Sequence, residues 1–291
     1  DGYKRQISAN ATDTDHHYFL DDVNGDGKSD LVWAYRNLDL LKYQSLVLPK
    51  SHTDHIETFT DGFNNQTKIE YQYLADQSSG IYNKASGATY PVRDDNGLSY
   101  VVSAVDSSNG IGGFNRMEYQ YAGARTHLTG RGFLGFKQRQ VINKQTDFVT
   151  TEHYLQDWPF IGELSWNRTT NDGDPVEDAY NHWQSSKVDY SNGQSTDFVS
   201  LKDSAQIQHE INDNGQLQAT VTQWDYDNWG NTSNINKTTG IGFSGNINTS
   251  FDPDGSFTKA NLSGWQQQKQ TQRTFLNDET NWRIGFVSSQ D

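Results

Sequence analysis

One stretch of this sequence, residues 22–30, combines residue types and spacing that could bind a metal ion. The oxygen-bearing positions are Asp22, Asn24, Asp26 and Asp30, together with the backbone carbonyl of Lys28. Gly27 lies between them and permits a sharp turn, so the oxygens can converge on one point. Calcium prefers six to eight oxygen ligands, and we therefore predict a structural calcium ion in this loop.

The loop departs from an EF-hand, because Trp33 stands where the bidentate glutamate belongs and an apolar run, Leu31-Val32-Trp33, follows at once. It instead resembles the calcium loop of FG-GAP or integrin-type β-propeller repeats, in which a strand follows the last aspartate. A plain Asp/Asn/Gly turn, satisfied by its own side-chain hydrogen bonds, is the alternative. In either case we expect the role of the loop to be structural.

Catalytic signatures are missing from the rest of the sequence. Residues 130–135 match G-x-G-x-x-G, but a dinucleotide site needs a helix after that motif, and Phe136 to Ile142 has the pattern of a strand. The chain has no cysteine, which excludes disulfides and thiolate catalysis. We therefore expect a non-enzymatic protein. A glycoside-processing enzyme stays open as a third possibility, since carboxylate pairs meet only in the fold.

The composition excludes some classes of binding partner. The 291 residues include 37 acidic against 23 basic side chains, for a net charge of -14, which opposes binding to nucleic acid. No apolar run approaches the about 20 residues that a membrane-spanning helix needs. Aromatic residues make up 13% of the chain and favour strands over helices.

Alternation and turn signals predict an all-β fold built from a meandering antiparallel sheet. Residues 68–73 (KIEYQY) and 116–121 (RMEYQY) each alternate a polar with an apolar face, so we expect two strands with their tyrosines buried. Asn-Gly and Asp-Gly pairs recur as hairpin signals. A short helix is considered at 174–186, where Asp174 and Pro175 could form an N-terminal cap.

The sequence falls into three zones without a clear linker between them. They are a calcium-loop segment at 1–50, a region of paired aromatic strands at 51–165, and a polar, repeat-like region at 166–291.

Four segments in this order resemble one protein family, the SpvB- and TcB-type toxin-complex shell proteins with Rhs (YD) repeats. They are the loop at 22–31, the strand start at 61–71, the block GRGFLGF at 130–136 followed by DWPFIG at 157–162, and the YD-like segment at 226–231. GRGFLGF is the most specific of them. The strand start departs from the family pattern at Asp61 and Asn64.

The resemblance implies a secreted or extracellular, hollow β-shell that encloses a toxic C-terminal polypeptide and works with a pore-forming translocation component. With a single FG-GAP-like loop, the chain is expected to be one section of such a shell and to carry no cargo activity. The second hypothesis is an extracellular, calcium-dependent adhesion or carbohydrate-binding module that uses exposed tryptophans.

Overall fold

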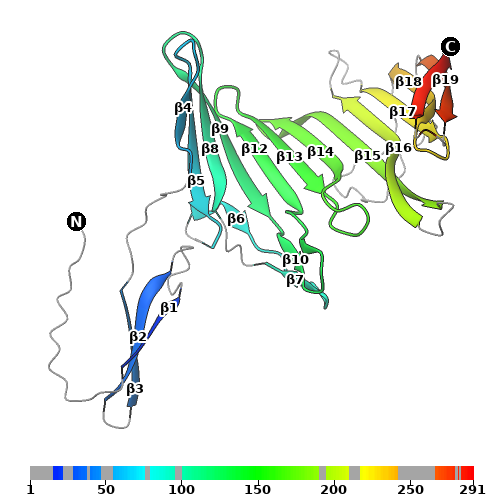
Figure 1. Ribbon diagram of the computed structural model, residues 1–291. Coiled ribbons are helices and arrows are strands. Elements are labelled where there is room, and N and C mark those ends of the chain that lie inside the picture. Colours follow the sequence, from blue (N-terminus) through cyan, green and yellow to red (C-terminus); the bar gives the residue numbers. More distant parts are fainter. Residues whose placement is uncertain are drawn as a thin grey trace. The chain divides into compact units, whose positions relative to one another are not determined.

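The computed structural model of the chain describes residues 16–21, 29–37, 40–46, 55–75, 79–95, 100–189, 195–209, 217–241, 266–278, 281 and 283–291. These residues form strands and turns, with no α-helix among them, and every strand pairing assigned a register is antiparallel. The all-β, antiparallel prediction is therefore confirmed (Figure 1). The chain divides into two compact units, residues 1–84 with 95–120 and residues 85–94 with 121–291. The three sequence zones stay a prediction.

The first unit contains two sheets. A three-stranded sheet is formed in sequence order by β1 (His16–Asp21), β2 (Asp30–Asn37) and β3 (Leu40–Leu46). The strands of the other sheet are β4 (Thr58–Thr60), β5 (Gln66–Tyr73), β6 (Tyr82–Asn83), β8 (Tyr100–Ser108) and β9 (Phe114–Ala122), the last of which ends in the second unit. They run in the order β9-β8-β5-β4, with β6 beside β9.

The two aromatic strands lie where the alternation predicted them, in β5 and β9. Tyr73 is buried and packs against Tyr100, with the ring planes tilted by 50° and 5.1 Å between ring centroids. Tyr71, Tyr119 and Tyr121 are half-buried. Period-two alternation therefore identified both strands correctly, whereas the predicted burial of the tyrosines is complete only at Tyr73.

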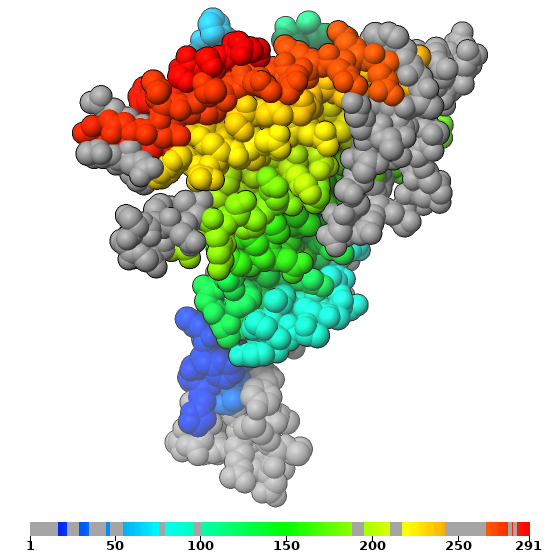
Figure 2. Space-filling model, turned by 90° about the vertical axis from the view of Figure 1, so that its right-hand side faces the viewer, coloured from blue at the N-terminus to red at the C-terminus, as the bar shows by residue number. Residues whose placement is uncertain are grey.

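The larger sheet of the second unit is a meander in which consecutive strands pair with one another. Its strands are β12 (Gln138–Asn143), β13 (Phe148–Tyr154), β14 (Leu164–Asn171), β15 (Asp174–Asp189), β16 (Ser195–Gln208), β17 (Gln218–Tyr226), β18 (Thr232–Ile241), β19 (Gln266–Asp278) and β20 (Arg283–Gln290). In Figure 2 they follow one another as bands of colour from green to red. β20 forms an edge of this sheet.

A small separate sheet completes the second unit. It consists of β7 (Val92–Asp94), β10 (Arg125–His127) and β11 (Gly132–Phe133), with β10 in the middle. The core of the larger sheet lies on β16 and β17, where Ala205, Ile207, Ala219 and Val221 are almost completely buried.

The helix considered at 174–186 is wrong, because these residues belong to β15, the longest described strand. Asp172 and Gly173 both adopt positive φ angles, 49° and 91°, as a tight hairpin turn requires. The turn sends β15 back along β14, where Tyr180 pairs with Trp166. Cross-strand pairing over the whole segment outweighs the local capping signal of Asp174 and Pro175.

Candidate functional site

The predicted calcium loop lies almost entirely outside the described residues, which include neither Asp22, Asn24, Asp26 nor Lys28. Asp30 is described: it begins β2, and its side chain is completely buried. Strand pairing places Asp30 opposite Asp21, so residues 22–29 connect two paired strands. The apolar run that follows, Leu31-Val32-Trp33, lies in β2 as expected.

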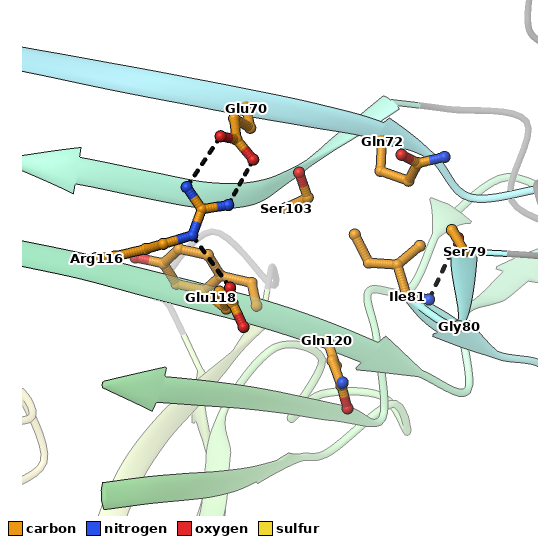
Figure 3. A pocket seen from close by; sticks show the side chains of 10 residues that line it. Glu70, Gln72, Ser79, Gly80, Ile81, Ser103, Arg116, Glu118 and Gln120 are labelled. Carbon is orange, nitrogen blue, oxygen red and sulfur yellow. Dashed lines mark hydrogen bonds and ion pairs between the residues drawn. The ribbon is translucent and has the colours of Figure 1, made fainter. Parts of the chain in front are cut away.

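The first unit carries a pocket of about 210 Å³ whose charged groups surround Arg116 (Figure 3). Arg116 on β9 donates from Nη1 and Nη2 to the two carboxylate oxygens of Glu70 on β5, at 2.9 and 2.6 Å. It also donates to Asp106 on β8, at 2.9 Å, and to Glu118 on its own strand, at 3.1 Å. One guanidinium therefore joins three neighbouring strands.

Arg116 and the carboxylates around it stabilise each other's charged forms. The hydrogen bonds from Arg116 hold the pKa of Glu70 below its usual value despite partial burial. The same hydrogen bonds raise the pKa of Arg116, and the bond to Glu70 contributes most. Since each of the three carboxylates already accepts a hydrogen bond from Arg116, the cluster stabilises strand packing, and its charged groups are committed to one another.

A second ionic cluster lies in the second unit around Asp178, whose side chain is completely buried. Arg168 on β14 donates to both oxygens of Asp178, at 2.7 and 3.0 Å, and Nε2 of His209 lies 2.9 Å from Oδ2. The hydrogen bond to Asp178 raises the pKa of Arg168 against the opposing effect of burial. A buried carboxylate needs such partners, so the cluster ties β14, β15 and the end of β16 together.

Two hairpin loops far apart in the sequence share one hydrogen-bond pattern. In residues 61–65, Oδ1 of Asp61 accepts from the backbone N–H groups two and four residues later, and Oδ2 accepts from the side chain of Asn65. In residues 227–231 the same three bonds run to Asp227, the aspartate of the YD-like segment. The loops also share the backbone bond that closes them, at 3.0 Å in both.

A third loop, residues 109–113, is a variant of this pattern. Asn109 replaces the aspartate and accepts from the N–H groups of Ile111 and Gly113, at 3.0 and 2.9 Å. A Cβ atom on Gly113 would meet Nδ2 of Asn109 at 2.8 Å. In this loop a side chain at the fifth position would press on the amide of Asn109, whereas the carboxylates of Asp61 and Asp227 accept a hydrogen bond from asparagine in the fifth position.

The sequence did not reveal that these three segments share a loop structure, nor that Asp227 reaches a neighbouring hairpin. Nδ2 of Asn277, on β19, donates to Oδ2 of Asp227 at 3.2 Å, and Oδ1 of Asn277 accepts from the N–H of Gly285 on β20. Burial raises the pKa of Asp227, but the hydrogen bonds from Asn231, Trp229 and Asn277 outweigh it and leave that pKa lowered. The carboxylate thus connects two successive hairpins.

The GRGFLGF block builds the small sheet and its connection to β12. Gly132 and Phe133 form β11, and the next strand is β12, so the helix that a dinucleotide site would need does not follow. Gln156, just before DWPFIG, donates from Nε2 to the carbonyls of Gly123 and Gly135, both at 2.8 Å. The two sequence blocks therefore lie together in the second unit.

Within the described part of the chain, histidine and acidic side chains form no group of three or more that could hold a metal ion. The same residues contain no helix long and apolar enough to cross a membrane.

Comparison with known proteins shows a family for the chain and a solved structure with a similar fold. Residues 3–162, more than half of the chain, match the family described as the insecticide toxin TcdB middle/N-terminal region. A search of solved structures finds a chain of the crystal structure of TcdB2-TccC3-Cdc42, with a TM-score of 0.61 and 11% sequence identity. The match covers 94% of this chain and 16% of the other, so the two share a fold over a small part of that longer protein. No curated protein matches.

Proposed function

Because the chain belongs to the insecticide toxin TcdB middle/N-terminal region family, we propose that it forms a non-enzymatic section of a toxin-enclosing β-shell of the SpvB/TcB and Rhs (YD-repeat) type. The observation that carries the proposal is the sequential meander β12 to β20, in which successive hairpins are joined through the YD-like aspartate, Asp227. A sheet built from sequential hairpins in this way can be extended by adding further hairpins at its edge.

The proposed partners are the rest of the shell, the toxic C-terminal polypeptide that it encloses and a pore-forming translocation component, in a secreted or extracellular assembly. The similar solved structure combines TcdB2 with TccC3 and Cdc42, which supports an assembly of more than one component.

The described tryptophans support the shell over a carbohydrate-binding module. A sugar-binding surface would need a row of exposed indoles. Among the described tryptophans only Trp158 is exposed. Trp166 stacks on His153 at 3.9 Å, and the indole N–H of Trp183 donates to the carbonyl of Leu164.

Protection from protease tests the shell proposal. The chain is expressed within one full-length product together with the toxin polypeptide that it would enclose. Limited proteolysis then measures the cleavage of both parts. We expect the enclosed part to resist cleavage, and Asp178→Ala, which leaves Arg168 and His209 without their buried partner, to abolish that resistance. Equal cleavage of the enclosed part with and without an intact wall would contradict the proposal.

Calcium binding at Asp22, Asn24, Asp26, Lys28 and Asp30 is a separate proposal. Its support is the donor set in sequence and the buried carboxylate of Asp30 at the end of a connection between paired strands. Calcium would supply the positive charge that five converging oxygens need, and its role would be to fix the loop.

Calorimetry and thermal unfolding with calcium test this site. We expect calcium to raise the melting temperature, because an ion that binds only the folded state stabilises it. Asp26→Ala should remove that increase, whereas Asp61→Ala, in an exposed loop elsewhere, should keep it. No heat of binding at millimolar calcium would refute the site.

A further inference from the structure

The loop at 227–231 is covered by a neighbouring hairpin, and this contact shows what a loop of its kind can bind. Nδ2 of Asn277 donates to Oδ2 of Asp227 at 3.2 Å, while Oδ1 of Asn277 accepts from Nδ2 of Asn231 at 3.4 Å. The backbone of Gly285 also lies against Asn231, since a Cβ atom added to Gly285 would meet Oδ1 of Asn231 at 2.7 Å. One carboxamide therefore binds the first and the fifth residue of the loop together.

The loop at 61–65 carries the same two groups without such a cover. Within the described part of the chain, Oδ2 of Asp61 accepts only from Nδ2 of Asn65, at 3.0 Å. All five residues of this loop are exposed. Hydrogen bonds from Asn65 lower the pKa of Asp61, so its carboxylate is ionised at neutral pH. Oδ2 of Asp61 therefore keeps open the acceptor position that Asn277 fills in the other loop.

The lengths of the neighbouring strands explain why one loop is covered and the other is not. β8 ends at Ser108, whose hydroxyl accepts from the N–H of Gln66 at the start of β5, so β8 stops level with the loop at 61–65. β19 pairs with β18 up to Gln272 and then continues to Asp278, so it extends past the loop at 227–231. The aromatic residue in the middle of each loop shows the same difference: Trp229 is half-buried, whereas Phe63 is 90% exposed.

We propose that the loop at 61–65 is a docking site for a β-hairpin of a protein partner, which places an asparagine side chain against Asp61 and Asn65 and covers Phe63. The occupied loop at 227–231 supplies the model for this contact, with Asn277 in the place of the partner's asparagine. Aromatic residues are enriched at the centres of protein interfaces, and Phe63 gives this one its apolar contact.

The chemistry of the two loop residues selects a carboxamide over other polar groups. Oδ2 of Asp61 needs a donor, and Nδ2 of Asn65 can donate to an acceptor, as Nδ2 of Asn231 does. An amide side chain supplies both, whereas a carboxylate only accepts and an ammonium group only donates. The inference rests on the comparison of the two loops, so it can fail or hold independently of the shell proposal.

Binding of a hairpin peptide to the whole chain tests the proposal. The probe is a backbone-cyclised peptide of residues 274–288, which copies the segment that covers the loop at 227–231. Ligand-observed NMR titration compares its affinity with those of peptides carrying Asn277→Ala or Asn277→Asp. We expect the alanine peptide to bind about tenfold more weakly, as loss of a hydrogen bond to a charged acceptor predicts, and the aspartate peptide to bind most weakly because it repels Asp61. Equal affinities of the three peptides, or no binding of the unmodified peptide at millimolar concentration, would overturn the proposal.

Variants of the chain locate the contact. Asp61→Asn combined with Asn65→Gly gives this loop the first and fifth residues of the loop at 109–113, which keeps the turn and removes both binding groups. The double variant should lose the preference among the three peptides, and Phe63→Ala, at a fully accessible position, should weaken all three about equally. Leu128→Ala, at an exposed apolar side chain in the second unit, should change nothing. Unchanged affinity of the unmodified peptide for the double variant would refute the site.

Discussion

The loops at Asp61 and Asp227 have the same hydrogen-bonded structure in different surroundings. In the first loop, Phe63 is 90% exposed and the carboxylate serves its own loop. In the second, Trp229 is half-buried and the carboxylate also accepts from Asn277 of the next hairpin. Local sequence therefore determines the shape of such a loop, and neighbouring elements determine how much of the fold depends on it.

The largest contrast is expected at the fourth loop position, where Gly112 and Gly230 both adopt a positive φ angle, 92° and 80°. Alanine at position 112 meets open space and costs only backbone strain, about 1 kcal/mol. Alanine at position 230 would in addition bring its Cβ to 2.7 Å from the Phe198 ring. We expect Gly230→Ala to cost about 3 kcal/mol in urea unfolding. Similar losses for both variants would break the comparison.

Removing the connection between hairpins should have the next largest effect. Asp227→Ala leaves four donor groups without their acceptor, two of them backbone N–H groups, and should cost about 2 kcal/mol. Asn277→Ala should cost less. Adding both changes should cost less than the sum of the single losses, because they share one hydrogen bond. Strict additivity in this cycle would show that the connection contributes nothing.

Acid should weaken the second unit through His153. Burial against Trp166, together with the charge of Lys137, lowers the pKa of His153 to about 4. The unfolded chain takes up this proton near pH 6.5 and the folded chain only near pH 4, so this contribution to stability is present above pH 6.5 and lost as pH falls toward 4. We expect the free energy of unfolding to fall by about 1–2 kcal/mol as the pH is lowered from 6.5 to 4. Melting curves of His153→Gln should lack this part of the pH dependence.

The smallest effect concerns the exchange between the first and fifth loop positions. Gly113→Asn should destabilise the 109–113 loop, because the new Cβ approaches the amide of Asn109. Adding Asn109→Asp should recover about 1 kcal/mol, since the carboxylate accepts the new side-chain N–H as Asp61 does from Asn65. If the double variant is no more stable than Gly113→Asn alone, the three loops do not follow one rule.

Features that depend on short stretches of sequence were predictable. The alternation in 68–73 and 116–121, the apolar run in β2 and the Asp61-Gly62 and Asn109-Gly110 turns all appear where expected. In each case the periodicity or turn chemistry of a few residues decides the structure.

Features that depend on pairing were not predictable. The helix considered at 174–186 failed because the two strands beside β15 decide its conformation. Nothing local marks Asp178 as the buried partner of Arg168 and His209, which come from 10 and 31 residues away.

The order of strands in the second unit also bears on how it folds. From β12 to β18 each strand pairs with the strand directly before or after it in the chain, over connections of nine residues or fewer, so these pairings require only short loop closures. Low separation between contacting residues favours fast folding. In the first unit β5 pairs with β4 directly before it, but its other neighbour, β8, follows only after β6 and β7. During synthesis the strands from β12 to β18 can therefore pair one after another as they emerge, whereas one edge of β5 stays unpaired until β8 arrives.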